Sequence, residues 1–130
     1  MKKSYLEIQQ EVINQYHVII DEHSTCWKRI HAHVRERRIC KWVSKNSVLS
    51  TFTLFHEIGH IETKTSTMRR CESEYHATEW AIAKCQEYGI TVPENLLIKY
   101  QEYIYREHDR GIRRGGNLPD KSELTLKCLR

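Results

Sequence analysis

The feature that most constrains this 130-residue chain is an apolar segment near its middle that also carries ionisable side chains. Its apolar residues recur at helical spacing and are Phe52, Leu54, Phe55, Ile58 and Ile61. Ser50 or Thr51 is suited to cap the start of such a helix. Histidine and glutamate lie within the same stretch, and burying them on an apolar helix is costly unless something satisfies them. The sequence therefore predicts a helix that packs in the core and also carries the side chains of a functional site.

Three further helices are predicted around this one. Residues 4–17 have apolar side chains at three- and four-residue intervals, which is typical of an amphipathic helix. Residues 72–88 keep one apolar side and end at Gly89, a favoured residue after a helix C-terminus. Pro93 is suited to open a last helix, which Gly111 and the glycines after it would close.

The segment between the first two helices has a different period. Apolar and polar residues alternate from residue 30 to 34, and a second apolar group follows at residues 39–43 after a charged break. We expect two short strands joined by a tight connection, and we predict no element for residues 117–130. The chain as a whole is predicted to form one α+β domain over residues 1–130, mainly helical, with a short sheet before the central helix.

Composition limits the classes of protein to consider. The chain is 39% apolar and 29% charged with five glycines and two prolines, as expected of a globular domain. No apolar run approaches the roughly 20 residues of a membrane span, and the N-terminal residues lack a secretion signal. The five cysteines form no Cys-x-x-Cys pair, which favours a reducing, cytoplasmic location. A net charge of +4 makes nucleic acid an unlikely partner and leaves acidic proteins open.

The central helix contains the pattern His56-Glu57-Ile58-Gly59-His60. Two histidines four residues apart lie on one helix face and can bind one metal ion, and neutral imidazole suits Zn²⁺. Glu57 would then lie beside a water molecule on that ion and act as the general base in peptide hydrolysis. The pattern also arises by chance, so its weight comes from the apolar helix and from the carboxylates that follow.

A hydrolytic zinc site needs a third protein ligand, and the helix at 72–88 offers several. Glu74 lies at the edge of the stripe that Ala77 and Ala81 define, whereas Glu72 and Glu79 are predicted to face solvent. His76 is the second candidate, since imidazole is an excellent zinc ligand. Spacing alone does not choose between Glu74 and His76.

Two blocks of sequence resemble the ImmA/IrrE family of small zinc metallopeptidases. The first is Phe-Thr-Leu-Phe-His-Glu-Ile-Gly-His at residues 52–60, and the second is Glu-Tyr-His-Ala-Thr-Glu-Trp-Ala at residues 74–81. The resemblance implies a zincin-like fold with a gluzincin-like site in which His56, His60 and Glu74 bind zinc and Glu57 is the base. Thr78 departs from the usual Asn or Asp, a position expected to orient a metal-binding histidine.

The resemblance also implies a substrate and a setting. Members of this family are typically found on phages and mobile elements, where they cleave a helix-turn-helix repressor. The segment Trp27 to Val34 is a candidate for pairing with an extended substrate by strand addition. Tyr75, His108 and Arg110 are candidate oxyanion stabilisers, because each side chain can donate a hydrogen bond.

Two other classes of function stay open at this point. One is a non-catalytic zinc-fold protein that holds a repressor, a toxin partner or nucleic acid. The other is the toxin of a toxin–antitoxin pair. An intact Glu57 favours hydrolysis, since a purely structural zinc needs no base.

Overall fold

The computed structural model describes residues 2–22, 30–64 and 67–130. Its elements follow the order α1 (Tyr5–Gln15), β1 (Ile19–Asp21), β2 (His31–His33), β3 (Arg38–Cys40), α2 (Val48–Glu62), α3 (Arg70–Glu87) and α4 (Glu94–Arg113). Two short 3₁₀ turns, η2 (Lys121–Leu124) and η3 (Lys127–Leu129), follow. The described part of the chain is a small α+β domain, as predicted.

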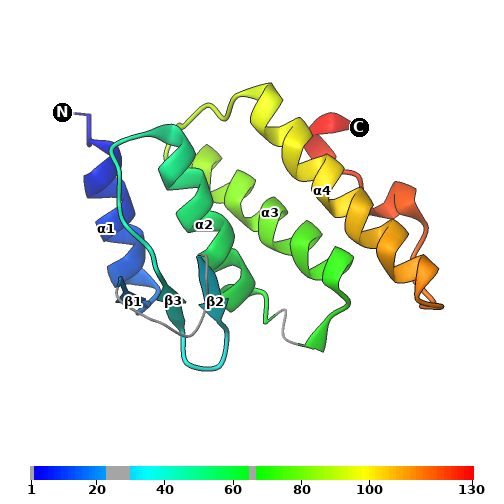
Figure 1. Cartoon of the computed structure of the whole chain (residues 1–130). Coiled ribbons are helices and arrows are strands. Elements are labelled where there is room, and N and C mark those ends of the chain that lie inside the picture. The colour runs from blue at the N-terminus through cyan, green and yellow to red at the C-terminus, as the bar shows by residue number, and fades with distance from the viewer. Residues whose placement is uncertain (1, 23–29, 65–66) are drawn as a thin grey trace.

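Helix α2 lies at the centre of the molecule. Figure 1 shows α1 and the sheet on one side of α2 and the helices α3 and α4 on the other. Phe52, Leu54, Phe55 and Ile58 are fully buried, so α2 contributes apolar contacts in several directions. This all-round burial explains why its histidines and glutamate end up inside the protein.

The sheet has the order β1-β3-β2, with β3 in the middle. β1 runs parallel to β3 and β2 runs antiparallel to it, with Ala32 opposite Ile39. The tight connection between β2 and β3 was predicted, and Arg37 adopts a positive φ of 53° there. β1 was not predicted, and residues 27–29 of the proposed substrate-pairing strand lie outside the described residues.

Some helix boundaries agree with the sequence, and the start of α2 and the end of α4 do not. Ser4 and Glu7 form a reciprocal capping box at the start of α1, and Gly89 takes a positive φ of 68° after α3. The prediction of Ser50 or Thr51 as the cap of α2 is wrong, because the cap is Ser47, whose side chain accepts from Ser50 N. Ser50 and Thr51 are instead buried inside the helix.

The C-terminal region packs against α4, although no element was predicted there. Leu124 and Leu126 are buried, and Gln101 on α4 bonds to the main chain of both. Gly111, expected to end α4, lies within it, and Gly115 takes the positive φ after its end. No helix in the described residues combines the length and the apolar character that a bilayer crossing requires.

Candidate metal centre

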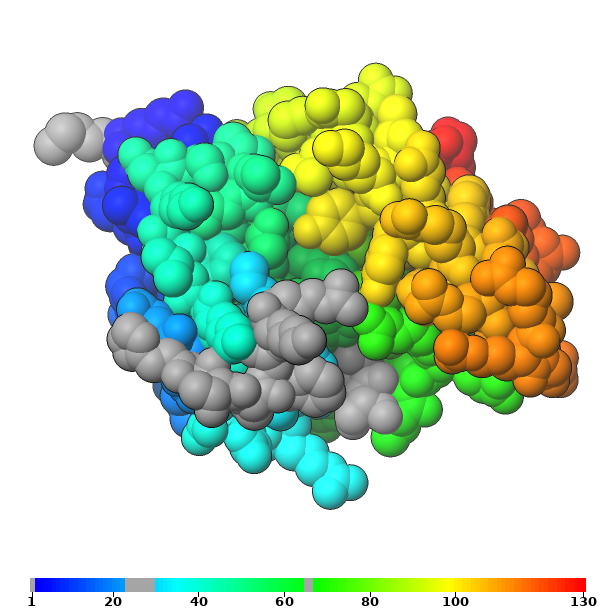
Figure 2. Space-filling view, in the orientation of Figure 1, coloured from blue at the N-terminus to red at the C-terminus, as the bar shows by residue number. Residues whose placement is uncertain are grey.

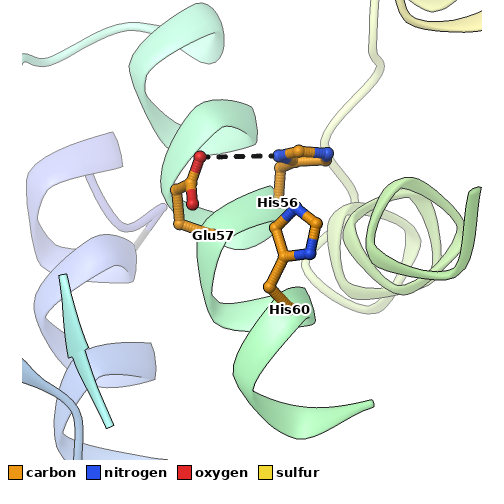
Figure 3. A group of neighbouring side chains, drawn as sticks. All are labelled: His56, Glu57 and His60. Atoms are coloured by element: carbon orange, nitrogen blue, oxygen red, sulfur yellow. Dashed lines mark ion pairs between the residues drawn. The ribbon is translucent and has the colours of Figure 1, made fainter. Parts of the chain in front are cut away.

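Three ionisable side chains of α2 meet on the side of the helix that faces α3 and α4. The rings of His56 and His60 lie 4.8 Å apart between centroids, as one helical turn predicts. A potential ligand atom from each of His56, Glu57 and His60 lies within 4.8 Å of the other two. Figure 3 shows the three side chains leaving α2, with the contact of 3.7 Å between His56 Nδ1 and Glu57 Oε1 dashed. The sequence pattern thus forms one cluster.

Helix α3 adds the carboxylate of Glu74 to this cluster. Glu74 Oε2 lies 3.0 Å from His56 Nε2 and 3.3 Å from His60 Nε2. A tetrahedral zinc ion with bonds of about 2.0–2.1 Å holds its ligand atoms ~3.3 Å apart. Both distances from the Glu74 oxygen to a histidine nitrogen therefore match the separation of two ligand atoms on one zinc ion.

The hydrogen bonding of these atoms fits a cation as well. His56 Nε2 and Glu74 Oε2 are buried and form an ion pair at 3.0 Å, but neither makes a hydrogen bond of acceptable geometry with the described residues. Buried polar atoms in proteins are nearly always satisfied, so these two facing atoms need either a proton or a cation between them. One metal ion between them would satisfy both.

Two ligand sets share the histidines, one with Glu57 and one with Glu74. Glu57 approaches His56 through Nδ1 at 3.7 Å, whereas Glu74 approaches Nε2 of both rings at 3.0 and 3.3 Å. The Glu74 set is closer to tetrahedral spacing and includes the unsatisfied atoms. We therefore favour Glu74 as the third ligand, which leaves Glu57 beside the site with its side chain 16% exposed.

A close approach of α2 and α3 makes this geometry possible. A Cβ atom added to Gly59 would lie 2.7 Å from the main-chain oxygen of Ala77 and 3.1 Å from its Cα. Only glycine fits this contact without moving one of the two helices. Because Ala77 is three residues after Glu74, the contact also sets how near the carboxylate comes to the histidines.

The charges of the cluster are strongly coupled. Burial alone would lower the pKa of His56, but Glu57 and Glu74 outweigh it and raise the pKa to about 9. Burial likewise opposes ionisation of Glu74, and the two histidines nevertheless hold its pKa far below the usual range. In the metal-free protein the site at neutral pH is therefore an imidazolium beside a carboxylate.

The residue that orients His60 was missed by the sequence reasoning. Ser73 Oγ lies 3.1 Å from His60 Nδ1, the ring nitrogen that points away from Glu74. Thr78, at the position expected for this role, donates from Oγ1 to the main-chain oxygen of Glu74 at 2.6 Å. Serine next to a ligand glutamate carries no signal of its own in the sequence.

The other candidate residues lie elsewhere. His76 is exposed on the far side of α3, although it was the second candidate for the third ligand. Tyr75 contacts Arg130, His108 Nε2 lies 2.8 Å from Pro119 O, and Arg110 pairs with Glu107. None of these three candidate oxyanion stabilisers lines a pocket of the cluster, so that prediction is corrected.

Two hollows open onto the cluster. The larger, which we call the β2 cleft, has a volume of about 710 Å³ and runs past residues 30–36 to Glu57, His60 and Glu74. The smaller, the α4 pocket, has about 350 Å³. Its lining beyond the cluster is Ile30, Arg70, Leu96, Lys99, Tyr100 and Tyr103.

Tyr100 on α4 lines the α4 pocket and carries a phenol that can donate a hydrogen bond. Its ring centroid lies 4.9 Å from that of His56, and burial raises the pKa of its phenol to about 12. A phenol with this pKa stays protonated and able to donate at neutral pH. Tyr100 lies on α4 four residues before the buried Ile104, and its position against His56 depends on how α4 packs.

Comparison with known proteins adds no relative: no family model, no curated protein and no solved structure matches this chain.

Proposed function

We propose that this chain is a zinc metallopeptidase of the kind that the ImmA/IrrE family represents, with a zincin-like active site. His56, His60 and Glu74 would bind the zinc ion, and Glu57 would be the general base. The observation that carries the proposal is the spacing of two histidine nitrogens and one carboxylate oxygen at 3.0 and 3.3 Å, with two of the three atoms buried and unsatisfied.

Zinc bound at such a site supplies Lewis-acid chemistry, which polarises a peptide carbonyl and lowers the pKa of water. Glu57 would take the proton of the attacking water and deliver it to the leaving amine. Its partial exposure, at 16%, supports this role because the carboxylate reaches the hollows where a substrate can enter. Tyr100, protonated and beside His56, would donate a hydrogen bond to the oxyanion.

The substrate would be an extended peptide in the β2 cleft. β2 lies at one end of the described strand order β1-β3-β2, and strand addition takes place at the edge of a sheet. The cleft follows residues 30–36 and reaches Glu57 and His60, which supports a substrate segment lying along β2. A flexible segment of a helix-turn-helix repressor in the cytoplasm is the substrate that we propose from the family resemblance.

The test is zinc content together with peptide cleavage. Wild type and Glu57→Gln are loaded with zinc, dialysed and measured by elemental analysis, and each is incubated with a proteome-derived peptide library. We expect one zinc per chain in both proteins and cleavage by the wild type alone. Zinc lost in Glu57→Gln would make Glu57 a ligand, and zinc-loaded wild type that cleaves no peptide or repressor would leave a non-catalytic binding protein as the function.

A further inference from the structure

The α4 pocket differs in charge from the metal cluster that it adjoins. Figure 2 shows α2 and α4 on opposite sides of a recess in this face of the molecule. The pocket volume of about 350 Å³ lies at the lower end of the range of ligand pockets, roughly 300–1,000 Å³. It can therefore hold a side chain of a peptide whose backbone passes the cluster.

Two cations line this pocket. Arg70 donates to the hydroxyl of Tyr103 at 2.9 Å and lies 3.7 Å from Glu74 Oε1, with its side chain 60% exposed at the rim of the pocket. Arginine has five N–H donors, so these contacts leave donors for a ligand. Lys99 forms no ion pair with any residue that the structure describes.

The carboxylates of the pocket do not cancel these charges once a metal ion is bound. Glu57 and Glu74 are the acidic residues of its lining, and a divalent ion held by the cluster balances both. The positive charges of Arg70 and Lys99 are then not neutralised by the acidic residues of the pocket lining. The remaining lining is apolar or aromatic and consists of Ile30, Leu96, Tyr100 and Tyr103.

We propose that the α4 pocket is a carboxylate-binding subsite, in which Arg70 and Lys99 bind an acidic group of the peptide substrate while the apolar wall contacts its aliphatic stem. The inference rests on the proposed peptidase function and adds a substrate class to it: peptides with an acidic residue, or a free C-terminal carboxylate, next to the scissile bond. A carboxylate between an arginine and a lysine forms charge-assisted hydrogen bonds.

Binding, measured apart from cleavage, tests this subsite. Zinc-loaded Glu57→Gln protein, in which the proposed general base is absent, is titrated into fluorescein-labelled, C-terminally amidated peptide pools. Two pools are identical except that one fixed position is Glu or Gln, and fluorescence anisotropy reports affinity. We expect the Glu pool to bind about fivefold more tightly at low salt, which is the size of one partly exposed ion pair.

Charge reversal identifies the residue responsible. In the same background Lys99→Glu is expected to abolish the preference for Glu, and the milder Lys99→Gln to reduce it, because Arg70 stays in the pocket. Lys2→Glu changes net charge equally at an exposed site outside both hollows, and it should leave the preference intact. Equal binding of the two pools, or equal effects of Lys99→Glu and Lys2→Glu, would overturn the subsite.

A second pair of pools, lacking acidic residues and ending in a free carboxylate or an amide, separates the two sources of the carboxylate. A preference for the free carboxylate assigns the pocket to the substrate C-terminus, and a preference in the Glu pool alone assigns it to a side chain. Cleavage of both Glu and Gln pools at equal rates and equal affinity refutes the subsite while the peptidase stands. A Glu preference in binding without cleavage by the wild type refutes the peptidase while the subsite stands.

Discussion

Substitution of Gly59 by alanine tests the idea that the distance between α2 and α3 sets the metal centre. The new Cβ would lie 2.7 Å from Ala77 O, and ordinary contact begins at 3.4 Å. Main-chain atoms cannot rotate away, so the helices must separate locally by about 0.7 Å. Metal–ligand distances tolerate only about ±0.2 Å, so Glu74 would be carried out of reach of an ion held by the histidines.

The expected signature is a loss of zinc affinity that exceeds the loss of stability. Overpacking costs about 1–3 kcal/mol, and replacing glycine within a helix returns about 1 kcal/mol, so the free energy of unfolding should fall by roughly 0–2 kcal/mol. Zinc affinity should fall by about 10- to 100-fold, as it does when ligand-supporting contacts are lost. Urea unfolding of the metal-free protein and competition with a chromophoric chelator measure the two quantities.

Gly111→Ala is the matched control. It also replaces a helical glycine, but the added Cβ meets Leu118 Cδ1, the end of a flexible side chain that can move aside. We expect wild-type zinc affinity and unchanged or slightly higher stability. The reasoning is refuted if Gly59→Ala binds zinc as tightly as Gly111→Ala does.

Four further predictions follow from the site. Glu74→Ala should lose zinc and His76→Ala should keep it, as elemental analysis after dialysis will show; the reverse result would exchange their roles. Zinc affinity should rise about tenfold per pH unit from pH 7 to 9, because protonated His56 cannot bind metal and its pKa is about 9; a flat profile in chelator competition would contradict this. Tyr100→Phe should reduce kcat by about 10- to 1,000-fold with zinc retained, and an unchanged kcat would exclude the phenol. Removing zinc by chelation should abolish cleavage but leave the far-ultraviolet circular dichroism of a folded protein; unfolding would make the metal structural.

Local patterns predicted the helices well because each helix carries its own signals. The apolar spacing of residues 4–17 and the glycine that follows residues 72–88 depend only on neighbouring residues, and the structure has α1 at Tyr5–Gln15 and a positive φ at Gly89. β1 was missed because its partner, β3, lies about twenty residues away, and a three-residue strand has too short a pattern to stand out. The cap of α2 was misplaced because Ser47, Ser50 and Thr51 are all residue types that can cap a helix. In the structure the side chains of Ser50 and Thr51 instead accept hydrogen bonds from Lys45 N and Gln9 Nε2, which leaves Ser47 as the cap.

The site was predictable where it follows a single helix and not where helices meet. His56, Glu57 and His60 come together through the spacing of α2 alone. Spacing left Glu74 and His76 open as the third ligand, and only the family resemblance implied Glu74. The contact of Ser73 with His60 depends on the rotation of α3 against α2. The same holds for Tyr100, whose ring reaches His56 only because α4 crosses at that point.

The coupling between proton and metal explains how this cluster can be buried without making the fold depend on zinc. In the metal-free protein the proton on His56 partly neutralises Glu57 and Glu74, so no carboxylate is left buried without a positive neighbour. The proposed metal binding would exchange that proton for a divalent ion among the same atoms. The apolar core around Phe52, Phe55 and Ile58 is formed without any contribution from a metal ion. In such a site the proton on His56 would lower the metal affinity at neutral pH, while the protein would stay folded without the metal. This combination is expected of a catalytic metal ion more than of a structural one.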